Sequence, residues 1–347
     1  MKKYLKIPSV IIIYALFACG SSTSTTKETD ESTVTLITHD SFAVSENLFD
    51  KFTSETGISV EQLSLGDTGQ LVSTAILTKK NPIGDVIFGI DNTFLSRALN
   101  AGIIDPYTSK LESNMIGDLN SPDSEYLIPI DYGHVCLNYW KDSFTESFPP
   151  PESIDDLISP SYSRLLVVQN PETSSPGLAF LLTTISRFGN DWVNYWQTLT
   201  QNGVHVTNDW ESSYYGDFIA GGGTKSIVVS YASSPIAELI YSDPPVETPP
   251  TGIIEDSCFR QIEYAGILKN TDNRSGAEAL IDFLLSQHFQ EDIPLNMFML
   301  PVKSEANLPN SFSTYPILPA DLNVLSPAKI ESNRNDWTEM WTQTVLR

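Results

Sequence analysis

The chain has 347 residues, of which 20 are Lys or Arg and 43 are Asp or Glu, so its formal net charge is −23. Such an acidic protein should avoid nucleic acid and anionic lipid headgroups and should attract cationic ligands. Cysteine is sparse, with only Cys19, Cys136 and Cys258. One disulfide between the last two is possible, and the sequence alone leaves that pairing open.

The N-terminus predicts an export signal rather than part of the fold. A basic start precedes an apolar run at residues 10–17, which is too short to span a bilayer permanently. The run leads into Leu-Phe-Ala-Cys ending at Cys19, which resembles the cleavage site of bacterial lipoproteins. We therefore expect residues 1–18 to be a signal peptide and Cys19 to be lipidated. Residues 19–32 are polar throughout and predict a flexible tether.

Strands alternate with helices from Val34 onward. Short β-rich runs at 34–38, 58–63 and 85–88 are each followed by a helical pattern, at 43–56, 67–80 and from about 92. This alternation predicts a mainly parallel sheet with helices on both faces. Ligands bind such sheets at the carboxyl ends of the strands. These ends carry the polar segments 39–41, 66–68 and 89–92.

A second α/β unit follows an extended segment at 135–139 that we expect to cross between lobes. Its predicted elements are strands at 165–168 and 226–230, a helix after Pro176 and a helix with a buried aromatic stripe at 192–199. The chain then crosses back at 260–265, and helices are expected at 276–288 and 335–345. These elements predict an α/β fold of two lobes, with residues 33–134 in lobe 1, 135–262 in lobe 2, and 263–347 returning to lobe 1 with the C-terminal helices.

Three segments of the second unit predict a polar cleft with an aromatic wall. They are 170–177, 208–210 and 230–235, and each combines serines or an aromatic residue with turn-forming Pro, Asn or Asp. Ser175 is the predicted N-cap of a helix with Pro176 at the first helical position. An anionic or carbonyl group could dock at the free N–H groups there. An ordinary capped helix remains the simpler interpretation of that segment taken alone.

Two lobes joined by two crossings, on a lipid tether, are typical of extracytoplasmic solute-binding proteins. In these proteins a ligand that contacts both lobes favours the closed state, which a transporter then recognises. Motifs shared with one known family of such proteins are spread over most of the chain after the tether. They are Thr38–Phe42, Gly89–Asn92, Pro129–Gly133, Gln169–Gly177, Ser230–Pro235, Met299–Val302 and the pair Trp337 and Trp341.

On these motifs the chain resembles the thiamine-binding component of bacterial thiamine ABC transporters. The resemblance implies a two-lobed, type II periplasmic-binding-protein-like fold with the ligand cleft between the lobes. It also implies a monomer without cofactors that captures thiamine, and its mono- and diphosphate, and delivers them to an ABC importer. The order of preference among these three ligands stays open.

The resemblance also implies which residues contact the ligand. It implies ligand contacts at Asp67, Thr68, Ser174, Ser175, Trp210, Tyr231, Ala232, Ser233 and Ser234. Trp210 and Tyr231 can offer π faces to the rings and the cation of thiamine, at about 0.5–2 kcal/mol per contact. Asp67 can supply the countercharge, although a plain helix N-cap is an equal interpretation. Ser174 and Ser175 can hold the hydroxyl or phosphate end.

The sequence departs from the family pattern at two positions. His39 stands where the family commonly has Tyr, and Phe298 stands where it commonly has Trp. Both positions flank the cleft in the family, so both residues are expected at the site with less stacking area. A charged His39 near a cationic ligand would weaken binding at low pH.

Two other classes of function compete with thiamine binding. Thiaminase I shares the predicted architecture, and Cys136 on the first crossing could act as its nucleophile with Glu263 as the base. A binding protein for polyamine or ferric iron is the closer alternative. Ferric sites combine Tyr, His and carboxylate ligands, and Tyr214 and Tyr215 are the nearest approach to a paired-tyrosine site, but only four His are present and no ligand spacing recurs.

Overall fold

The computed structural model describes residues 32–116, 119, 125–315, 319, 323 and 325–347. The expected signal peptide (1–18), the lipidation site Cys19 and residues 20–31 of the expected tether lie outside the described residues. Within the ranges that are described, no helix combines the length and apolarity needed to cross a lipid bilayer.

The strands of the described residues join into one sheet. They are β1 (Thr33–Thr38), β2 (Ser59–Ser64), β3 (Val86–Asp91), β4 (Ile104–Asp105), β5 (Ile128–Trp140), β6 (Leu166–Gln169), β7 (His205–Thr207), β8 (Ile227–Tyr231), β9 (Thr251–Leu268) and β10 (Leu300–Pro301). Along the sheet the order is β2-β1-β3-β9-β5-β8-β6-β7, while β4 pairs with β9 and β10 pairs with β5.

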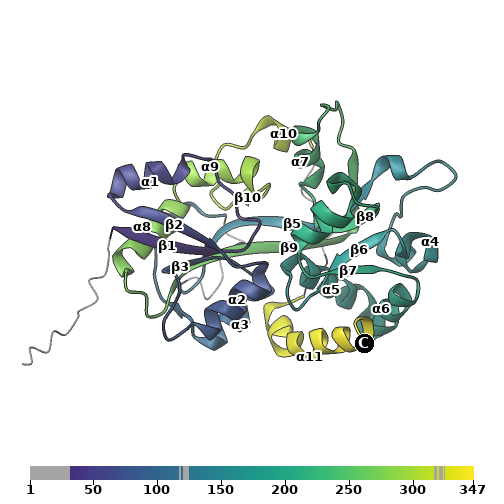
Figure 1. The fold of residues 1–347 in the computed structure, drawn as a ribbon, viewed down its shortest axis with the longest axis horizontal. Helices are drawn as coiled ribbons and strands as arrows, with labels where there is room; N and C mark the ends of the chain where they lie inside the picture. Colours follow the sequence, from purple (N-terminus) through teal and green to yellow (C-terminus); the bar gives the residue numbers. More distant parts are fainter. Residues whose placement is uncertain (1–31, 117–118, 120–124, 316–318, 320–322, 324) are drawn as a thin grey trace, which may run out of the picture.

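The sheet consists of two parallel parts joined by two long antiparallel strands, as Figure 1 shows. β1 runs parallel to β2 and β3, and β6 runs parallel to β7 and β8. Between these parts β5 and β9 pair with each other, while β9 also pairs with β3 and β5 with β8. We call the part around β1–β3 the first lobe and the part around β6–β8 the second lobe.

The predicted two-lobed α/β fold with two crossings is therefore confirmed. The residue boundaries at 134/135 and 262/263 stay a prediction, and they fall within β5 and β9. Because both crossings are strands of one sheet, they can bend while their ladder of backbone hydrogen bonds holds the lobes in register.

Helices cover both faces of the sheet in each lobe (Figure 1). They are α1 (Leu48–Thr56), α2 (Thr68–Leu77), α3 (Leu95–Ala101), α4 (Pro160–Ser163), α5 (Ser175–Phe188), α6 (Trp192–Gln201), α7 (Ser234–Tyr241), α8 (Arg274–Leu284), α9 (Gln287–Asn296), α10 (Asn310–Thr314) and α11 (Pro327–Val345). The helix expected at 276–288 is two helices, because Ser286 adopts an extended backbone and caps α9 by accepting from the backbone N–H of Phe289.

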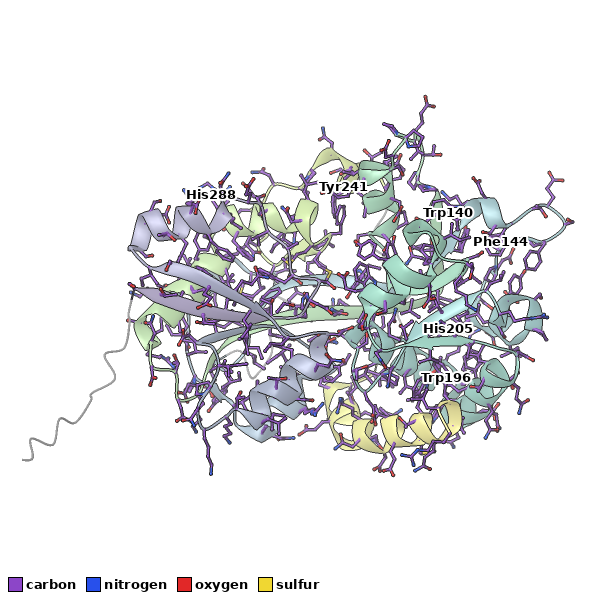
Figure 2. The ribbon with its side chains drawn as sticks, in the orientation of Figure 1. Trp140, Phe144, Trp196, His205, Tyr241 and His288 are labelled. Carbon is purple, nitrogen blue, oxygen red and sulfur yellow. A yellow bond between two sulfur atoms is a disulfide. The ribbon has the colours of Figure 1, made fainter. Side chains whose placement is uncertain are left out.

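The last helix contacts both lobes. Trp341 of α11 is fully buried and packs edge-to-face on Trp196 of α6, with 5.4 Å between ring centroids; Figure 2 shows Trp196 beside α11. Two turns into α11 the guanidinium of Arg334 lies 4.4 Å from the ring centroid of Phe94 in the first lobe. α11 therefore packs on both lobes, and the assignment of residues 263–347 to lobe 1 with the C-terminal helices stays a prediction.

The two lobes touch through their backbones beside α2. Gly69 of the first lobe donates its N–H to the carbonyl oxygen of Thr173 in the second lobe at 2.9 Å. A Cβ at Gly69 would lie 2.4 Å from the carbonyl oxygen of Glu172, so this close approach requires glycine. The structure thus has the lobes in contact, as expected for the closed state of a two-lobed binding protein.

A disulfide joins the two crossing strands. Cys136 of β5 is bonded to Cys258 of β9, and both residues are buried. This settles the pairing that the sequence left open. Cys136 consequently has no free thiol in this structure.

Candidate ligand-binding site

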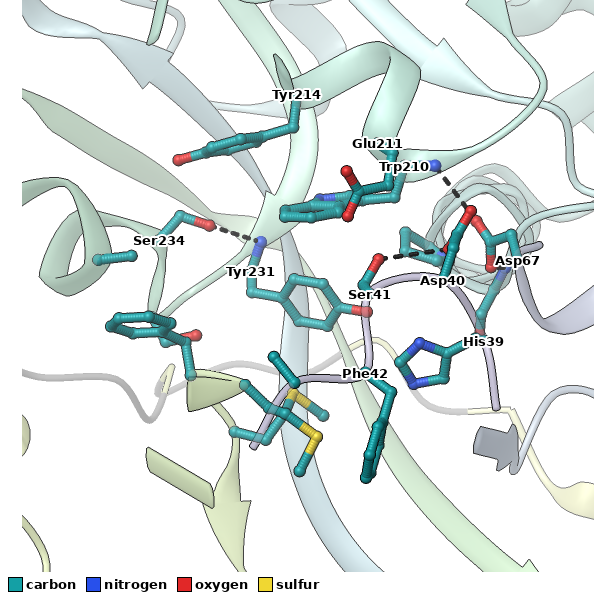
Figure 3. Close-up of a pocket in the computed structure, with 18 of the residues that line it drawn as sticks. His39, Asp40, Ser41, Phe42, Asp67, Trp210, Glu211, Tyr214, Tyr231 and Ser234 are labelled. Carbon is teal, nitrogen blue, oxygen red and sulfur yellow. Dashed lines mark hydrogen bonds between the residues drawn. The ribbon is translucent and has the colours of Figure 1, made fainter. Parts of the chain in front are cut away.

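A cavity of about 390 Å³ lies between the two lobes (Figure 3). Its wall in the first lobe comes from the loop after β1 and the start of α2, with the turn before β10 beside them. Its wall in the second lobe comes from the residues after β7 and the turn from β8 into α7. The volume is within the usual range for pockets that bury a small organic ligand.

Most of the residues predicted from the sequence line this cavity. The nine that do are His39, Asp67, Thr68, Ser175, Trp210, Tyr231, Ser233, Ser234 and Phe298. Ser174 and Ala232 do not. Ala232 packs against the Cys136–Cys258 disulfide instead.

The predicted cap of α5 is wrong by one residue. Ser174, not Ser175, has the extended backbone of an N-cap, and its hydroxyl accepts from the N–H of Gly177 at 3.5 Å. Ser175 is the first helical residue, and Pro176 follows it at the second position. The shift turns the Ser175 side chain toward the cavity, where its hydroxyl is buried with no hydrogen-bond partner among the described residues.

The second lobe supplies an aromatic wall, formed by Trp210, Tyr214, Tyr215 and Tyr231. The Trp210 ring is stacked on Tyr214 at 4.9 Å and an interplanar angle of 20°, and Tyr231 meets it edge-on at 6.3 Å. The indole Nε1 donates to Ser230 Oγ at 3.0 Å. Stacking and this hydrogen bond together fix the Trp210 ring beside the cavity.

Hydroxyl groups brace the same wall from behind. The Oγ atoms of Ser230 and Ser234 are 2.8 Å apart, and Ser234 Oγ also accepts from the N–H of Tyr231 at 3.2 Å. The Tyr214 hydroxyl donates to Glu238 Oε1 at 2.7 Å. These contacts lie within the second lobe, so they do not depend on closure.

Asp67 of the first lobe is the residue that bridges the cavity. Its carboxylate accepts from the N–H of Thr68 at 2.7 Å, at the start of α2. It also accepts from two N–H groups of the second lobe, Ser175 at 3.3 Å and Trp210 at 3.2 Å; Figure 3 shows the bond to Trp210. Burial raises the pKa of Asp67 to about 6, although its hydrogen bonds favour the ionised form.

The first lobe also places an ionisable pair, His39 and Glu263, at the cavity. His39 Nε2 is 3.5 Å from Glu263 Oε1. Burial acts to lower the pKa of His39, but the Glu263 carboxylate outweighs it and the net shift is upward. Burial and the Glu263 charge raise the pKa of Asp131 well above its usual value. Gly89 makes room for His39, because a Cβ there would lie 2.2 Å from His39 Cδ2.

Phe298 closes the cavity near β10 in an unusual backbone conformation. Its φ of 56° lies in the left-handed region, which costs a bulky residue about 1–3 kcal/mol. The ring is stacked on Phe312 at 6.3 Å and meets Tyr241 edge-on at 5.7 Å. Packing on both sides thus holds a strained residue at the rim of the cavity.

The sequence prediction missed much of the cavity lining, and the acidic residues are the most important omission. Further lining residues are Asp40, Ser41, Phe42, Glu211, Tyr214, Tyr215, Glu238, Tyr241, Glu263, Met297 and Met299. The sequence pointed to Glu263 only as a base for Cys136 on the other crossing strand, not as part of the ligand cavity. Nothing in the local sequence distinguishes Glu211 or Glu238 from ordinary surface acids.

The described part of the chain contains no group of three or more His, Cys, Asp or Glu side chains arranged to hold a metal ion. Tyr214, considered with Tyr215 as a paired-tyrosine iron site, instead stacks on Trp210 and donates its hydroxyl to Glu238. Its phenol is therefore part of the aromatic wall.

Comparison with known proteins agrees with this architecture. The thiamine-binding periplasmic protein of Escherichia coli (strain K12) is 26% identical over 318 residues, 90% of this chain and 94% of that protein. The protein of the same name from Brucella suis biovar 1 (strain 1330) is 26% identical over 344 residues, 97% and 98% of the two chains. A solved periplasmic thiamin binding protein matches with a TM-score of 0.81 and 27% identity, over 91% of this chain and 96% of that one.

The family model described as bacterial extracellular solute-binding protein matches residues 81–324. This match covers well over half of the chain, including both crossing strands and the whole aromatic wall. The protein therefore belongs to the bacterial extracellular solute-binding protein family.

Proposed function

We propose that this protein captures thiamine outside the cytoplasm and delivers it to an ABC importer. The observation that carries the proposal is the pairing of a braced aromatic wall with a buried carboxylate, Asp67, across one cavity. Thiamine combines a flat aminopyrimidine with a permanently cationic thiazolium, so it needs both features. The similarity to proteins named as thiamine-binding supports the same ligand.

In this proposal each lobe recognises a different part of thiamine. Trp210 and Tyr231 offer π faces to the rings, and Asp67 offers negative charge to the thiazolium or accepts from the exocyclic amine. A ligand held between them favours the closed state, in which Asp67 also accepts from Ser175 and Trp210. The importer would recognise that closed state.

We also propose that the protein is a monomer held at a membrane surface. Residues 1–18 would direct export, and the lipid on Cys19 would anchor the domain. Replacing Cys19 by Ala should move the exported protein from the membrane fraction to the soluble fraction. If the variant stays in the membrane fraction, the proposed anchor is wrong.

The competing functions fit the site less well. A thiaminase-like reaction would need the Cys136 thiol, which is taken up by the disulfide with Cys258. A polyamine would satisfy the carboxylates but has no ring to stack on Trp210. For ferric iron, the described residues offer no ligand cluster.

Calorimetric titration tests the proposal directly. The purified protein should bind thiamine with a one-to-one stoichiometry and should bind spermidine and ferric citrate much more weakly. No binding of thiamine, or tighter binding of spermidine, would refute thiamine as the ligand. Incubation with thiamine and a nucleophilic base should release no thiazole.

A further inference from the structure

The charges that line the cavity are almost all negative. Among the described residues, no Lys or Arg side chain lines it, and the internal segments outside those residues contain neither type. Among the described lining residues His39 is the only basic side chain, and it is already paired with Glu263. The five carboxylates of the lining are Asp40, Asp67, Glu211, Glu238 and Glu263. A phosphate group in this cavity would therefore meet several negative charges and no fixed positive charge.

At two of the helix starts beside the cavity, a carboxylate of the protein already occupies backbone donors that could hold a phosphate. The helix starts at Thr68 and Ser175 would ordinarily attract an anion. Here the Asp67 carboxylate accepts from both N–H groups, and from that of Trp210 as well. An external phosphate would have to displace this carboxylate or lie beside it without the donors.

Two further acids lie at the same end of the cavity as Asp67. Figure 3 shows Asp40, Asp67 and Glu211 grouped beside the Trp210 ring. Burial raises the pKa of Glu211, and the negative charge of Asp40 raises it further, so the two carboxylates repel each other. A cation would relieve that repulsion, whereas a phosphate would increase it.

A neutral hydroxyl group fits a polar position of the wall that remains open. Ser175 Oγ is buried, lines the cavity and has no hydrogen-bond partner in the described part of the chain. A serine hydroxyl can donate to one group and accept from another. It can therefore complete a hydrogen bond with an alcohol, without a countercharge.

We propose that this cavity selects unphosphorylated thiamine, with an order of affinity of thiamine, then its monophosphate, then its diphosphate. The proposal rests on the thiamine-binding function proposed above and answers which of its three forms the site prefers. Glu211 and Asp40 are the residues that would impose the selection, because each phosphate adds negative charge next to them.

Calorimetric titration of the three forms at about pH 7.5 and one ionic strength tests this order. The dissociation constant should rise at each step and should be about tenfold or more higher for the diphosphate than for thiamine. A diphosphate that binds as tightly as thiamine, or more tightly, would overturn the selection while leaving the proposed function intact. Failure of all three forms to bind would instead refute the function.

Charge-neutral variants identify the residues responsible. Glu211→Gln and Asp40→Asn should each lower the ratio of the dissociation constant of the diphosphate to that of thiamine by about threefold or more. The matched control Glu255→Gln removes one negative charge from an exposed position outside the cavity and should leave the ratio unchanged. A ratio that is unchanged in both cavity variants, with melting temperatures like the parent's, would overturn the assignment to these acids.

Discussion

The two walls of the cavity are built on different principles. The wall of the second lobe is aromatic, and stacking with hydrogen bonds to neutral hydroxyls fixes Trp210 within that lobe. The wall of the first lobe is ionisable, and its key carboxylate, Asp67, accepts from two backbone N–H groups of the other lobe. The contacts of the aromatic wall form within the second lobe, whereas those of Asp67 with Ser175 and Trp210 form only when the lobes are in contact.

Because of this difference, one wall recognises the flat shape of a ligand and the other recognises its charge. The aromatic wall can recognise a flat ring in the open state, at little cost in reorganisation. The first-lobe wall holds a buried carboxylate whose pKa is about 6, so its charge is stabilised by whatever cation arrives. We infer that the aromatic wall makes the first contact with the ligand and that the charged wall then favours closure.

The largest effect should come from removing the centre of the aromatic wall. Trp210→Ala should weaken thiamine binding by about 30- to 100-fold, because it removes a π face and the neighbour on which Tyr214 stacks. Calorimetry measures the change, and Trp210→Phe, which keeps a ring, should recover most of the affinity. Unchanged affinity in the Ala variant would show that Trp210 belongs to the scaffold.

Removing the charge of Asp67, which accepts hydrogen bonds across the cavity, should have the next largest effect on affinity. Asp67→Asn keeps the size of the side chain but removes its charge, so thiamine affinity should fall by about 10- to 30-fold. Small-angle scattering should show that the liganded variant is less fully closed than the parent. The control Asp50→Asn changes an exposed acid of α1 and should bind normally. Equal binding by both variants would contradict a bridging role for Asp67.

Much of the fold is predictable because its elements repeat a simple pattern. Strands alternate with helices in each lobe, and strand ends carry polar residues, so His39, Asp67 and Tyr231 could be assigned to the cleft from sequence alone. The offset of one residue at Ser174 could not, because the choice of cap depends on backbone angles that both serines can adopt.

The acids of the cavity were harder to predict for a different reason. Glu211 and Glu238 lie on segments whose sequence is also typical of an exposed turn and an exposed helix face. Only the packing of the aromatic wall turns them toward the cavity. The sequence therefore predicts the ring-binding side of the site better than its charge, and the charge governs preference among related ligands.

The pH dependence of binding should report mainly the carboxylate of Asp67. A bound cation stabilises the Asp67 carboxylate and lowers its pKa below about 6, so binding releases protons near that pH. Affinity should therefore fall as the pH falls, by about tenfold between pH 8 and pH 5. His39, whose pKa is raised, would act in the same direction by gaining positive charge.

Calorimetry in buffers of different ionisation enthalpy would measure the proton release, and Asp67→Asn is its control. The variant should lose the larger part of the dependence, and the smaller part that remains should come from His39. A full pH dependence in the variant would move the titrating group from Asp67 to His39, Asp40 or Glu211.

The smallest effect should come from Phe298, where the two walls meet. Its left-handed backbone is imposed by the turn before β10, so exchanging one bulky side chain for another leaves that strain unchanged. Phe298→Trp should tighten thiamine binding by about two- to fivefold, because indole offers a cation the better π face, and Phe298→Leu should weaken it by a similar factor. Affinities in the order Trp, Phe, Leu would make Phe298 part of the aromatic surface. If all three bind alike, the ring serves only to pack on Phe312, and the second lobe alone supplies the π faces of the site.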